Sequence, residues 1–341
     1  MTKLNFGVDV SEKTLDLAYW DQSKQKPIFL DKFPNTKQGF QTIASRIEKI
    51  SKDIGNGDVS VLVVMEPSGG YEQPFAHFAY DRQWEVSLPN PYRVKLWGMA
   101  TGVRAKTDKN DAKTLAHYAR MQDPLQWRPL PVEVEQLEHL LRRLETSESM
   151  LRQEKNRWHS AENRVNPHKQ ATRLHKQTIA FMEQQILKIQ KAIKEHLSVH
   201  PHLEQQKKLL LTVSGVGERN CLYILVMMHR WGSLTEGKGD IKGLVAYVGL
   251  DPKPHESGSS VRKRASISRQ GNGQFRARLY MSALGGVKGN NPLRAFYKRL
   301  VGRDKPKKVA LTAAARKILI WSWMVFSTNT PFDVTRFEGN H

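Results

Sequence analysis

The first part of the chain alternates between strand-like and helix-like hydrophobic patterns. Three apolar-rich segments separated by short polar turns come first, at residues 6–10, 14–20 and 28–33. The second of them alternates apolar and polar positions, as a half-buried strand does. Apolar residues at helical spacing follow over about 36–53, and residues 59–65 form a continuous apolar run of strand length. This order predicts three adjoining antiparallel strands, a helix and a buried central strand.

The same alternation continues to about residue 130. We predict a further helix near 73–82, a strand near 86–88 and a helix that opens at Asp108. Three antiparallel strands followed by alternating helices and strands is the order of a ribonuclease-H-like α/β fold. We therefore predict that residues 1–130 form such a domain.

Beyond this domain the pattern is helical. Leucines and isoleucines recur at helical spacing from about residue 132 to 211, and Pro167 interrupts them, which predicts two long helices in a hairpin. A polar helical pair that buries only a stripe usually finds a partner helix, so we expect a dimerisation arm. We predict a coiled-coil connector over 131–208 and a mainly helical domain over 209–341, interrupted by a polar loop at 252–273.

Composition indicates a nucleic-acid partner. Lys and Arg number 54 against 33 Asp and Glu, a net charge of +21, and such an excess is typical of proteins that bind nucleic acid. The excess is concentrated after residue 211, and no acidic residue occurs between Glu256 and Asp304. A basic cluster of this kind binds the phosphate backbone by counterion release, whereas a solvated basic face is the alternative.

Other classes of protein are disfavoured. A single cysteine, Cys221, excludes an internal disulfide and a thiolate zinc cluster, and fits a reducing compartment. No run reaches the roughly 18 uninterrupted apolar residues that a membrane span needs, and the N-terminus does not resemble a signal peptide. We expect a cytoplasmic protein without a membrane partner.

Four acidic residues lie where the predicted fold would bring them together. Asp9 is flanked by valines in the first strand, so its side chain points to the opposite face, and Glu66 ends the buried strand 59–65. Asp108 and Asp111 are three apart at a helix start and share one face. Because the first and fourth strands of a ribonuclease-H-like sheet are neighbours, we expect these acids to converge.

Converging carboxylates indicate a metal site. They repel one another unless a cation lies among them, and oxygen ligands in this number suit Mg²⁺ or Mn²⁺. Two such ions can activate a nucleophile and stabilise a leaving oxygen in phosphoryl transfer. The alternative is structural: Asp108 as a helix N-cap, and Asp111 as a first-turn acid favoured by the helix dipole. Asp9 and Glu66 resist that alternative, because an unpaired charge in an apolar strand is costly.

A second candidate element lies at residues 209–226, LLLTVSGVGERNCLYILV. The pattern predicts a helix, a tight turn containing Gly215 and Gly217, and a second helix. It resembles a helix-hairpin-helix element, in which backbone amides at a helix start bind a DNA phosphate without reading the sequence. A plain helical hairpin could use the same glycines. Cys221 lies amid apolar residues and is expected in the core.

Several short motifs occur in an order and spacing typical of one family. They are GVDVS at Gly7, EPSGGY at Glu66, KTDKNDA at Lys106, SGVG at Ser214, AYVGLDP at Ala246, ESGSSVRKR at Glu256 and ISRQGN at Ile267. Together they resemble the DEDD insertion-sequence transposases, which are related to the Piv invertases. These transposases are directed by a bridge RNA. The resemblance covers nearly the whole chain. It implies a RuvC-like N-terminal domain, a coiled-coil connector and a C-terminal transposase domain with a catalytic serine.

The resemblance also assigns roles. It places the family's acidic quartet on Asp9, Glu66, Asp108 and Asp111, and its nucleophile on Ser257, the first serine of ESGSS, with Ser259 and Ser260 as competitors. It implies that this serine attacks a DNA phosphodiester and forms a transient phosphoserine link, while Mg²⁺ held by the quartet stabilises the phosphate charge. A hydroxyl is a weak nucleophile, so a metal or a base must activate it.

The partners implied by the resemblance are donor and target DNA, a bridge RNA that pairs with both, and further copies of the chain in a dimer or tetramer. Such a protein would work in the bacterial cytoplasm, associated with the nucleoid. Where pairing reads the sequence, protein contacts read mainly backbone and shape. Candidates for those contacts are Arg262, Lys263, Arg264, Arg269, Arg276 and Arg278.

Two other functions remain open from the sequence. In a hydrolytic RuvC-like nuclease or resolvase, water would attack the phosphate and Ser257 would only shape its loop. In a non-catalytic scaffold, the basic C-terminal part would bind nucleic acid and the acidic quartet would be structural.

Overall fold

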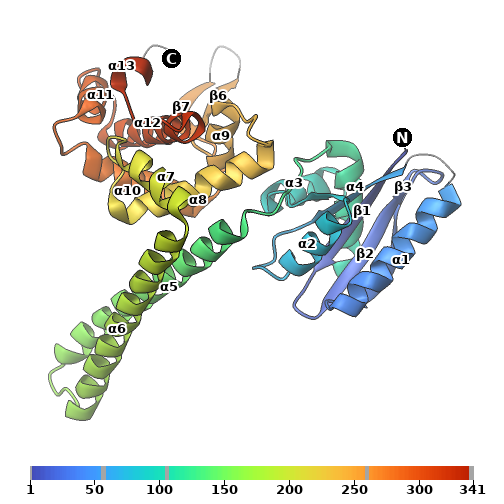
Figure 1. Cartoon of the computed structure of the whole chain (residues 1–341), viewed down its shortest axis with the longest axis horizontal. Helices are drawn as coiled ribbons and strands as arrows, with labels where there is room; N and C mark the ends of the chain where they lie inside the picture. Colours follow the sequence, from blue (N-terminus) through green and yellow to red (C-terminus); the bar gives the residue numbers. More distant parts are fainter. Residues whose placement is uncertain (1, 55–58, 104–106, 258–260, 338–341) are drawn as a thin grey trace. The chain divides into compact units, whose positions relative to one another are not determined.

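The computed structural model describes residues 2–54, 59–103, 107–257 and 261–337, with the backbone alone for 254–257 and 261–265. The chain divides into two compact units, Met1–Pro129 with Ser233–Lys238 and Leu130–Gly232 with Gly239–His341. The first contains a central sheet, and the second is mostly helical (Figure 1). The predicted mixture of an α/β part and a mainly helical part is confirmed.

The N-terminal unit is built on a five-stranded sheet of order β3-β2-β1-β4-β5. Its strands are β1 (Thr2–Val10), β2 (Thr14–Asp21), β3 (Lys26–Pro34), β4 (Val59–Met65) and β5 (Glu85–Ser87). The first three are antiparallel neighbours, and β1 is also parallel to β4. The prediction that the first and fourth strands are neighbours is therefore confirmed.

Helices cover both faces of this sheet. On one face, α1 (Lys37–Ile54) and α2 (Gln73–Asp81) pack against a core that contains Phe6, Val8 and Met65. On the other face lie α3 (Pro91–Ala100) and α4 (Asp108–Gln122), which pack on Leu62 and Val64. Since successive strand residues point to opposite faces, each strand contributes to both cores.

Helix α4 packs unusually close to the centre of the sheet. A Cβ atom added at Gly7 of β1 would lie 2.2 Å from the backbone nitrogen of Ala116 and 2.3 Å from the carbonyl oxygen of Ala112. Both alanines are fully buried with Ala18 of β2. The absence of side-chain bulk on both sides lets the helix backbone rest on β1, and this contact sets where the first turn of α4 lies.

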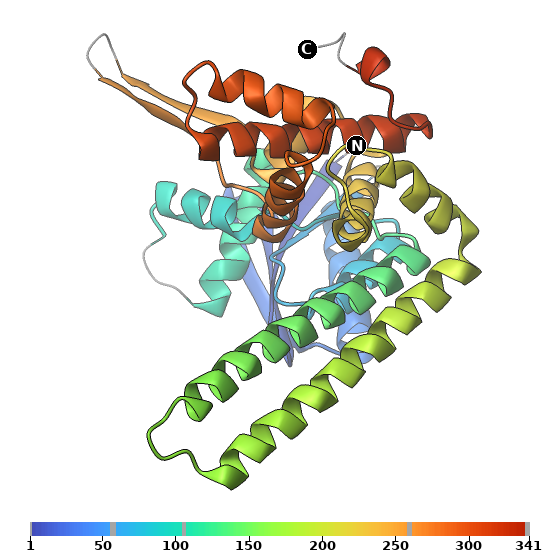
Figure 2. The same cartoon turned by 90° about the vertical axis from the view of Figure 1, so that its left-hand side faces the viewer.

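In the second unit, α5 (Val132–Glu162) and α6 (Lys169–Val199) run side by side as a hairpin (Figure 2). Leu137 and Leu141 of α5, with Ile193 and Leu197 of α6, are buried in the unit's core. The predicted pair of long helices is present, with Pro167 in its connection.

The rest of the second unit packs around one apolar helix. Its helices are α7 (Pro201–Leu211), α8 (Glu218–Thr235), α9 (Ile241–Val248), α10 (Gly273–Gly286), α11 (Pro292–Val301), α12 (Lys307–Thr328) and α13 (Val334–Phe337). Within the described ranges α12 alone is long and apolar enough to cross a membrane, but 61% of that apolar window is buried inside the protein. Trp321 at its centre is fully buried, as in a core helix. Cys221 is also buried, as predicted.

The structure contains one helix that was not predicted and a hairpin where a loop was predicted. Helix α3 was not predicted, because its apolar residues lie on several sides rather than on one face; its start is marked by Asn90, whose side chain accepts a hydrogen bond from Tyr92 N at 2.9 Å. The segment predicted as a polar loop contains a hairpin of β6 (Pro252–Ser257) and β7 (Val261–Ile267). In this segment charged residues alternate with Val261, Ala265 and Ile267, as in a strand. The alternation was not recognised because the segment is rich in charged and small residues.

We predict that Gly7→Ala destabilises the N-terminal unit. The added methyl group would overlap the backbone of α4, and overpacking of this kind costs about 1–3 kcal/mol. Gly285→Ala is the matched control, because a Cβ there meets nothing within 4 Å and lies inside a helix; it should leave stability unchanged or raise it. Urea unfolding measures both. Equal stability of the two variants would contradict the close packing of α4 on β1.

Candidate active site

Two of the predicted acids follow from the register of the central strands. Val8 of β1 is paired with Met65 of β4, so Asp9 and Glu66 come next on two parallel neighbours. Residues two apart on a strand share a face, which puts Asp9 on the same side as Gly7, against α4. Both acids therefore lie where the sheet meets the start of that helix.

The other two acids belong to the first turn of α4. Thr107 is the N-cap of this helix, with its side chain accepting a hydrogen bond from Asn110 N at 3.3 Å. The structural alternative in which Asp108 caps the helix is therefore wrong. Asp108 and Asp111 both follow the cap, where the helix dipole favours negative charge.

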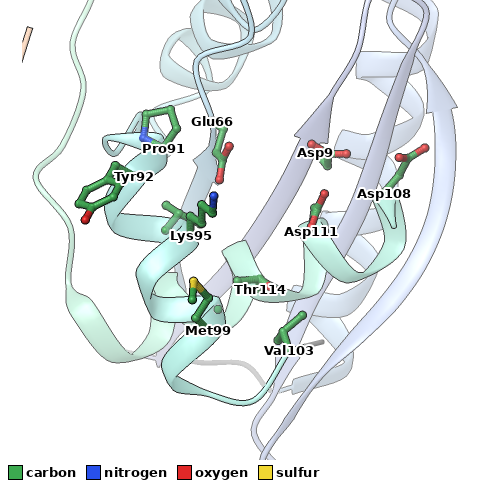
Figure 3. Close-up of a pocket in the computed structure, with 12 residues that line it drawn as sticks. Asp9, Glu66, Pro91, Tyr92, Lys95, Met99, Val103, Asp108, Asp111 and Thr114 are labelled. Carbon is green, nitrogen blue, oxygen red and sulfur yellow. The ribbon is translucent and has the colours of Figure 1, made fainter. Parts of the chain in front are cut away.

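All four acids line a single cavity of about 690 Å³. Figure 3 shows Asp9 and Asp111 from adjacent elements, with Glu66 across the pocket from them. The remaining wall comes mainly from α3 and the segment after it, with Tyr92, Lys95, Met99 and Val103. Lys95 is the only basic residue among the described lining residues, and its amine points toward Glu66. Because α3 was not predicted, none of these wall residues was singled out from the sequence.

The cavity disfavours negative charge on Asp9. Burial raises the pKa of the Asp9 carboxyl group to about 6, and the negative charges of Asp111, Asp108 and Asp16 contribute in the same direction. A hydrogen bond from the backbone of Val10 opposes this rise only in part. A cation bound among these side chains would lower the energy of the ionised form.

The structure adds a fifth acid, Asp16, that the sequence analysis missed. It is opposite Asp9 in the β1–β2 register and is only 2% exposed. The Lys32 ammonium nitrogen lies 3.1 Å from a carboxylate oxygen of Asp16 and 3.1 Å from one of Asp108. Asp16 Oδ1 is buried and has no hydrogen-bond partner among the described residues. The sequence analysis missed Asp16 because it occupies a polar position of an alternating strand, and such positions normally face solvent.

These side chains are of the type that binds a divalent cation, although they do not all converge on one position. The acidic oxygens, the raised pKa of Asp9 and the unpartnered Asp16 Oδ1 fit a hard cation that prefers oxygen. Within the described part of the chain, no three Asp, Glu, His or Cys side chains are close enough to hold one ion as they stand. Asp108 instead forms an ion pair with Lys32.

The candidate glycines of the second unit lie in the turn between α7 and α8. Gly215 has a φ of +96°, and a Cβ there would come within 2.9 Å of both Leu293 and Ile318. The conformation and the packing each explain this glycine without a ligand. A Cβ at Gly217 would meet nothing within 4 Å, so packing does not account for that one.

The candidate basic residues differ in their surroundings. Arg276 donates hydrogen bonds to the carbonyl oxygens of Val248 and Gly271, at 2.9 and 2.7 Å. Arg278 forms an ion pair of 3.1 Å with Glu145. Both thus stabilise the unit itself, whereas Arg269 is exposed. The backbones of Arg262, Lys263 and Arg264 lie in β7, and their side chains are outside the described part.

The predicted nucleophile lies at the end of a strand. Ser257 is the last residue of β6 and is opposite Val261 of β7. Its side chain is outside what the structure describes, and so are the competing residues Ser259 and Ser260. The acids and this serine thus belong to different units of the chain.

Comparison with known proteins identifies the family. A transposase family model matches residues 6–167, which include all four predicted acids. The model of the transposase IS116/IS110/IS902 family matches residues 207–298, which include the Gly215 turn and Ser257. The chain belongs to this transposase family. It is therefore an enzyme that cleaves and rejoins DNA, and the family resemblance carried by the short sequence motifs is confirmed.

Two curated relatives match this transposase over nearly their whole length. The pilin gene-inverting protein of Moraxella lacunata is 28% identical over 334 residues, which cover 98% of each chain. The pilin gene-inverting protein of Moraxella bovis has the same identity and coverage. The similarity therefore spans both units rather than one of them.

Proposed function

We propose that this transposase recombines DNA by phosphoryl transfer, with divalent metal bound at the acidic cavity, Ser257 as the nucleophile and a bridge RNA as the guide. The observation that carries the proposal is the cavity in which Asp9, Glu66, Asp108 and Asp111 meet. The helix dipole accounts for Asp108 and Asp111, but not for Asp9 in β1 or for Glu66 after β4, which lie in the same cavity although burial there raises the pKa of Asp9.

Asp9, Glu66, Asp108 and Asp111 would hold Mg²⁺ or Mn²⁺. When bound, the metal supplies positive charge that stabilises the negatively charged phosphate during transfer. Lys32 balances Asp16 and Asp108 at the rim. Lys95 lies in the same cavity and is a suitable contact for a DNA phosphate oxygen. In this proposal Lys95 positions the phosphate and Lys32 stabilises the ionised form of Asp108, while bound metal would stabilise the ionised form of Asp9.

Ser257 would make the covalent bond. Its hydroxyl oxygen attacks the phosphorus atom, a P–O bond of the DNA breaks, the serine proton goes to a base and the departing oxygen takes up a proton. The phosphoserine link retains the energy of the broken phosphodiester, so a DNA hydroxyl can later attack it and restore the serine. Ser257 begins the basic stretch without acidic residues that runs to Arg303, which supports this role, because the positive charge that follows it favours an approaching phosphate backbone.

Guidance by RNA and self-assembly complete the proposal. The basic C-terminal unit would bind donor and target DNA and a bridge RNA, with Gly217 in a helix-hairpin-helix contact and Arg269 among the exposed cations. The hairpin of α5 and α6 leaves Leu174, Phe181 and Leu187 more than half exposed, which favours a coiled-coil contact with a further copy of the chain. We retain the division into domains 1–130, 131–208 and 209–341, and a cytoplasmic, nucleoid-associated location.

Loss of an acid in the cavity should abolish DNA cleavage. We expect Asp9→Asn and Asp111→Asn to lower strand cleavage in Mg²⁺ by about 100-fold or more, because each removes charge that holds the metal. Asp123→Asn is the control: it removes the same charge from the exposed end of α4 and keeps a residue that tolerates the left-handed conformation there. Gel assays of strand cleavage, with thermal melts of each variant, test this. Wild-type cleavage by Asp9→Asn, or undiminished cleavage in EDTA, would show that the acids are structural.

Ser257→Ala should remove the covalent intermediate. The parent enzyme is expected to form a DNA adduct that survives detergent, and digestion followed by mass spectrometry should place it on Ser257. Ser266→Ala in β7 is the control and should retain the adduct, and Ser259→Ala and Ser260→Ala test the competing serines. If Ser257→Ala cleaves at the parent's rate and the parent yields no adduct, the enzyme is a hydrolytic nuclease.

The guide prediction has a separate test. Enzyme purified under native conditions from its own host should retain one defined small RNA, which sequencing will identify. That RNA should contain segments complementary to donor and target DNA, because pairing supplies the specificity. Recovery of random fragments alone would contradict guidance by RNA and would leave the cleavage chemistry unaffected.

A further inference from the structure

The C-terminal unit contains a second cavity, which none of the predicted site residues lines. It has a volume of about 920 Å³ and lies between the start of α9, the second half of α11 and the part of α12 from Ala313 to Thr328. A volume of this size is within the range of about 300–1,000 Å³ that ligand pockets occupy.

The cavity carries a strong excess of positive charge. Its basic lining residues are Lys242, Arg299, Arg316 and Lys317. The only acid among the described lining residues is Asp240, whose Oδ1 accepts a hydrogen bond from Gly243 N at 2.7 Å and so caps α9. In the described ranges, Lys242, Arg299 and Arg316 form no ion pair with the protein. This charge would attract an anion.

Aromatic and apolar side chains lie among these cations. The Arg299 guanidinium carbon is 5.4 Å from the centre of the half-buried Phe296 ring, and the Lys317 ammonium nitrogen is 5.8 Å from it. Ile320, Trp323 and Met324 of α12 add to the apolar lining, and Ile320 and Trp323 are largely buried. A simple inorganic anion would bind the cations without contacting the aromatic and apolar side chains. A planar ring bearing a phosphate would contact both the cations and these side chains.

We propose that this cavity binds an unpaired nucleotide of a single-stranded nucleic acid. The base packs against Phe296 beside the planar guanidinium of Arg299, and Lys242 and Arg316 contact the phosphates. A duplex hides its base faces inside the stack and is too wide for a pocket of this size, which is why the ligand is unpaired. The proposal goes beyond the cleavage chemistry and needs neither Ser257 nor the acidic cavity.

Charge reversal inside and outside the cavity provides a matched comparison. Lys242→Glu with Arg316→Glu alters the cavity, and Lys307→Glu with Lys308→Glu makes the same change in charge on exposed lysines at the start of α12, outside the cavity. The full-length proteins are titrated into fluorescein-labelled single strands of about 12 thymidines or uridines, and anisotropy is followed across a salt series. We expect the cavity pair to weaken binding at least about tenfold and to reduce the salt slope by about 1.4, and the control pair to change affinity no more than about twofold.

Phe296→Leu tests the ring separately from the charge. It keeps the apolar contact and should weaken binding of both strands about fivefold or more without altering the salt slope. In the unaltered protein, a strand containing 5-iodouracil should crosslink to peptides of α11 or α12, a result that depends on no variant's folding. Equal losses for the two charge-reversed pairs, crosslinks confined to other peptides, or thymidine monophosphate binding as tightly as the strand would overturn the proposal.

Discussion

The contact between α4 and β1 is the constraint on which the acidic cavity depends. With glycine at position 7 and alanines at 112 and 116, the helix backbone approaches the sheet closely enough to exclude any side chain between them. That approach carries the first turn of α4 to the ends of β1 and β4, where Asp9 and Glu66 emerge. A larger residue at this contact would separate the two halves of the cavity without changing any of its acids.

Bringing these acids together has an electrostatic cost that the fold only partly offsets. Lys32 bridges Asp16 and Asp108 at the rim, while Asp9 keeps a raised pKa because burial and its acidic neighbours act together. A charged cluster held in this way is poorly stabilised by the protein alone and is well suited to a cation. The same side chains therefore link the packing of the N-terminal unit to the proposed chemistry of the transposase.

The positively charged residues of the basic C-terminal unit have two different roles. Arg276 and Arg278, both candidates for nucleic-acid contacts from the sequence, hold a loop and an ion pair within the unit. The cations that line the second cavity lie instead beside partly buried aromatic and apolar side chains, and the one acid among its described lining residues is Asp240, the cap of α9. Net charge alone does not distinguish these uses, because it counts a buried structural arginine and a free one equally.

The sequence by itself determined the order of the strands along the first domain and the pair of long helices, because hydrophobic period depends on local pattern. The placement of the four acids around one cavity followed from that order of elements, which is the order of a ribonuclease-H-like sheet. The family followed from the order of its short motifs. Only the tertiary structure revealed α3 with Lys95, the pairing of β6 with β7, and Asp16 opposite Asp9. Their positions depend on which faces pack together: β2, which carries Asp16, is contacted by α4, a helix far along the sequence. The second cavity likewise exists only because α9, α11 and α12 meet, which no local pattern specifies.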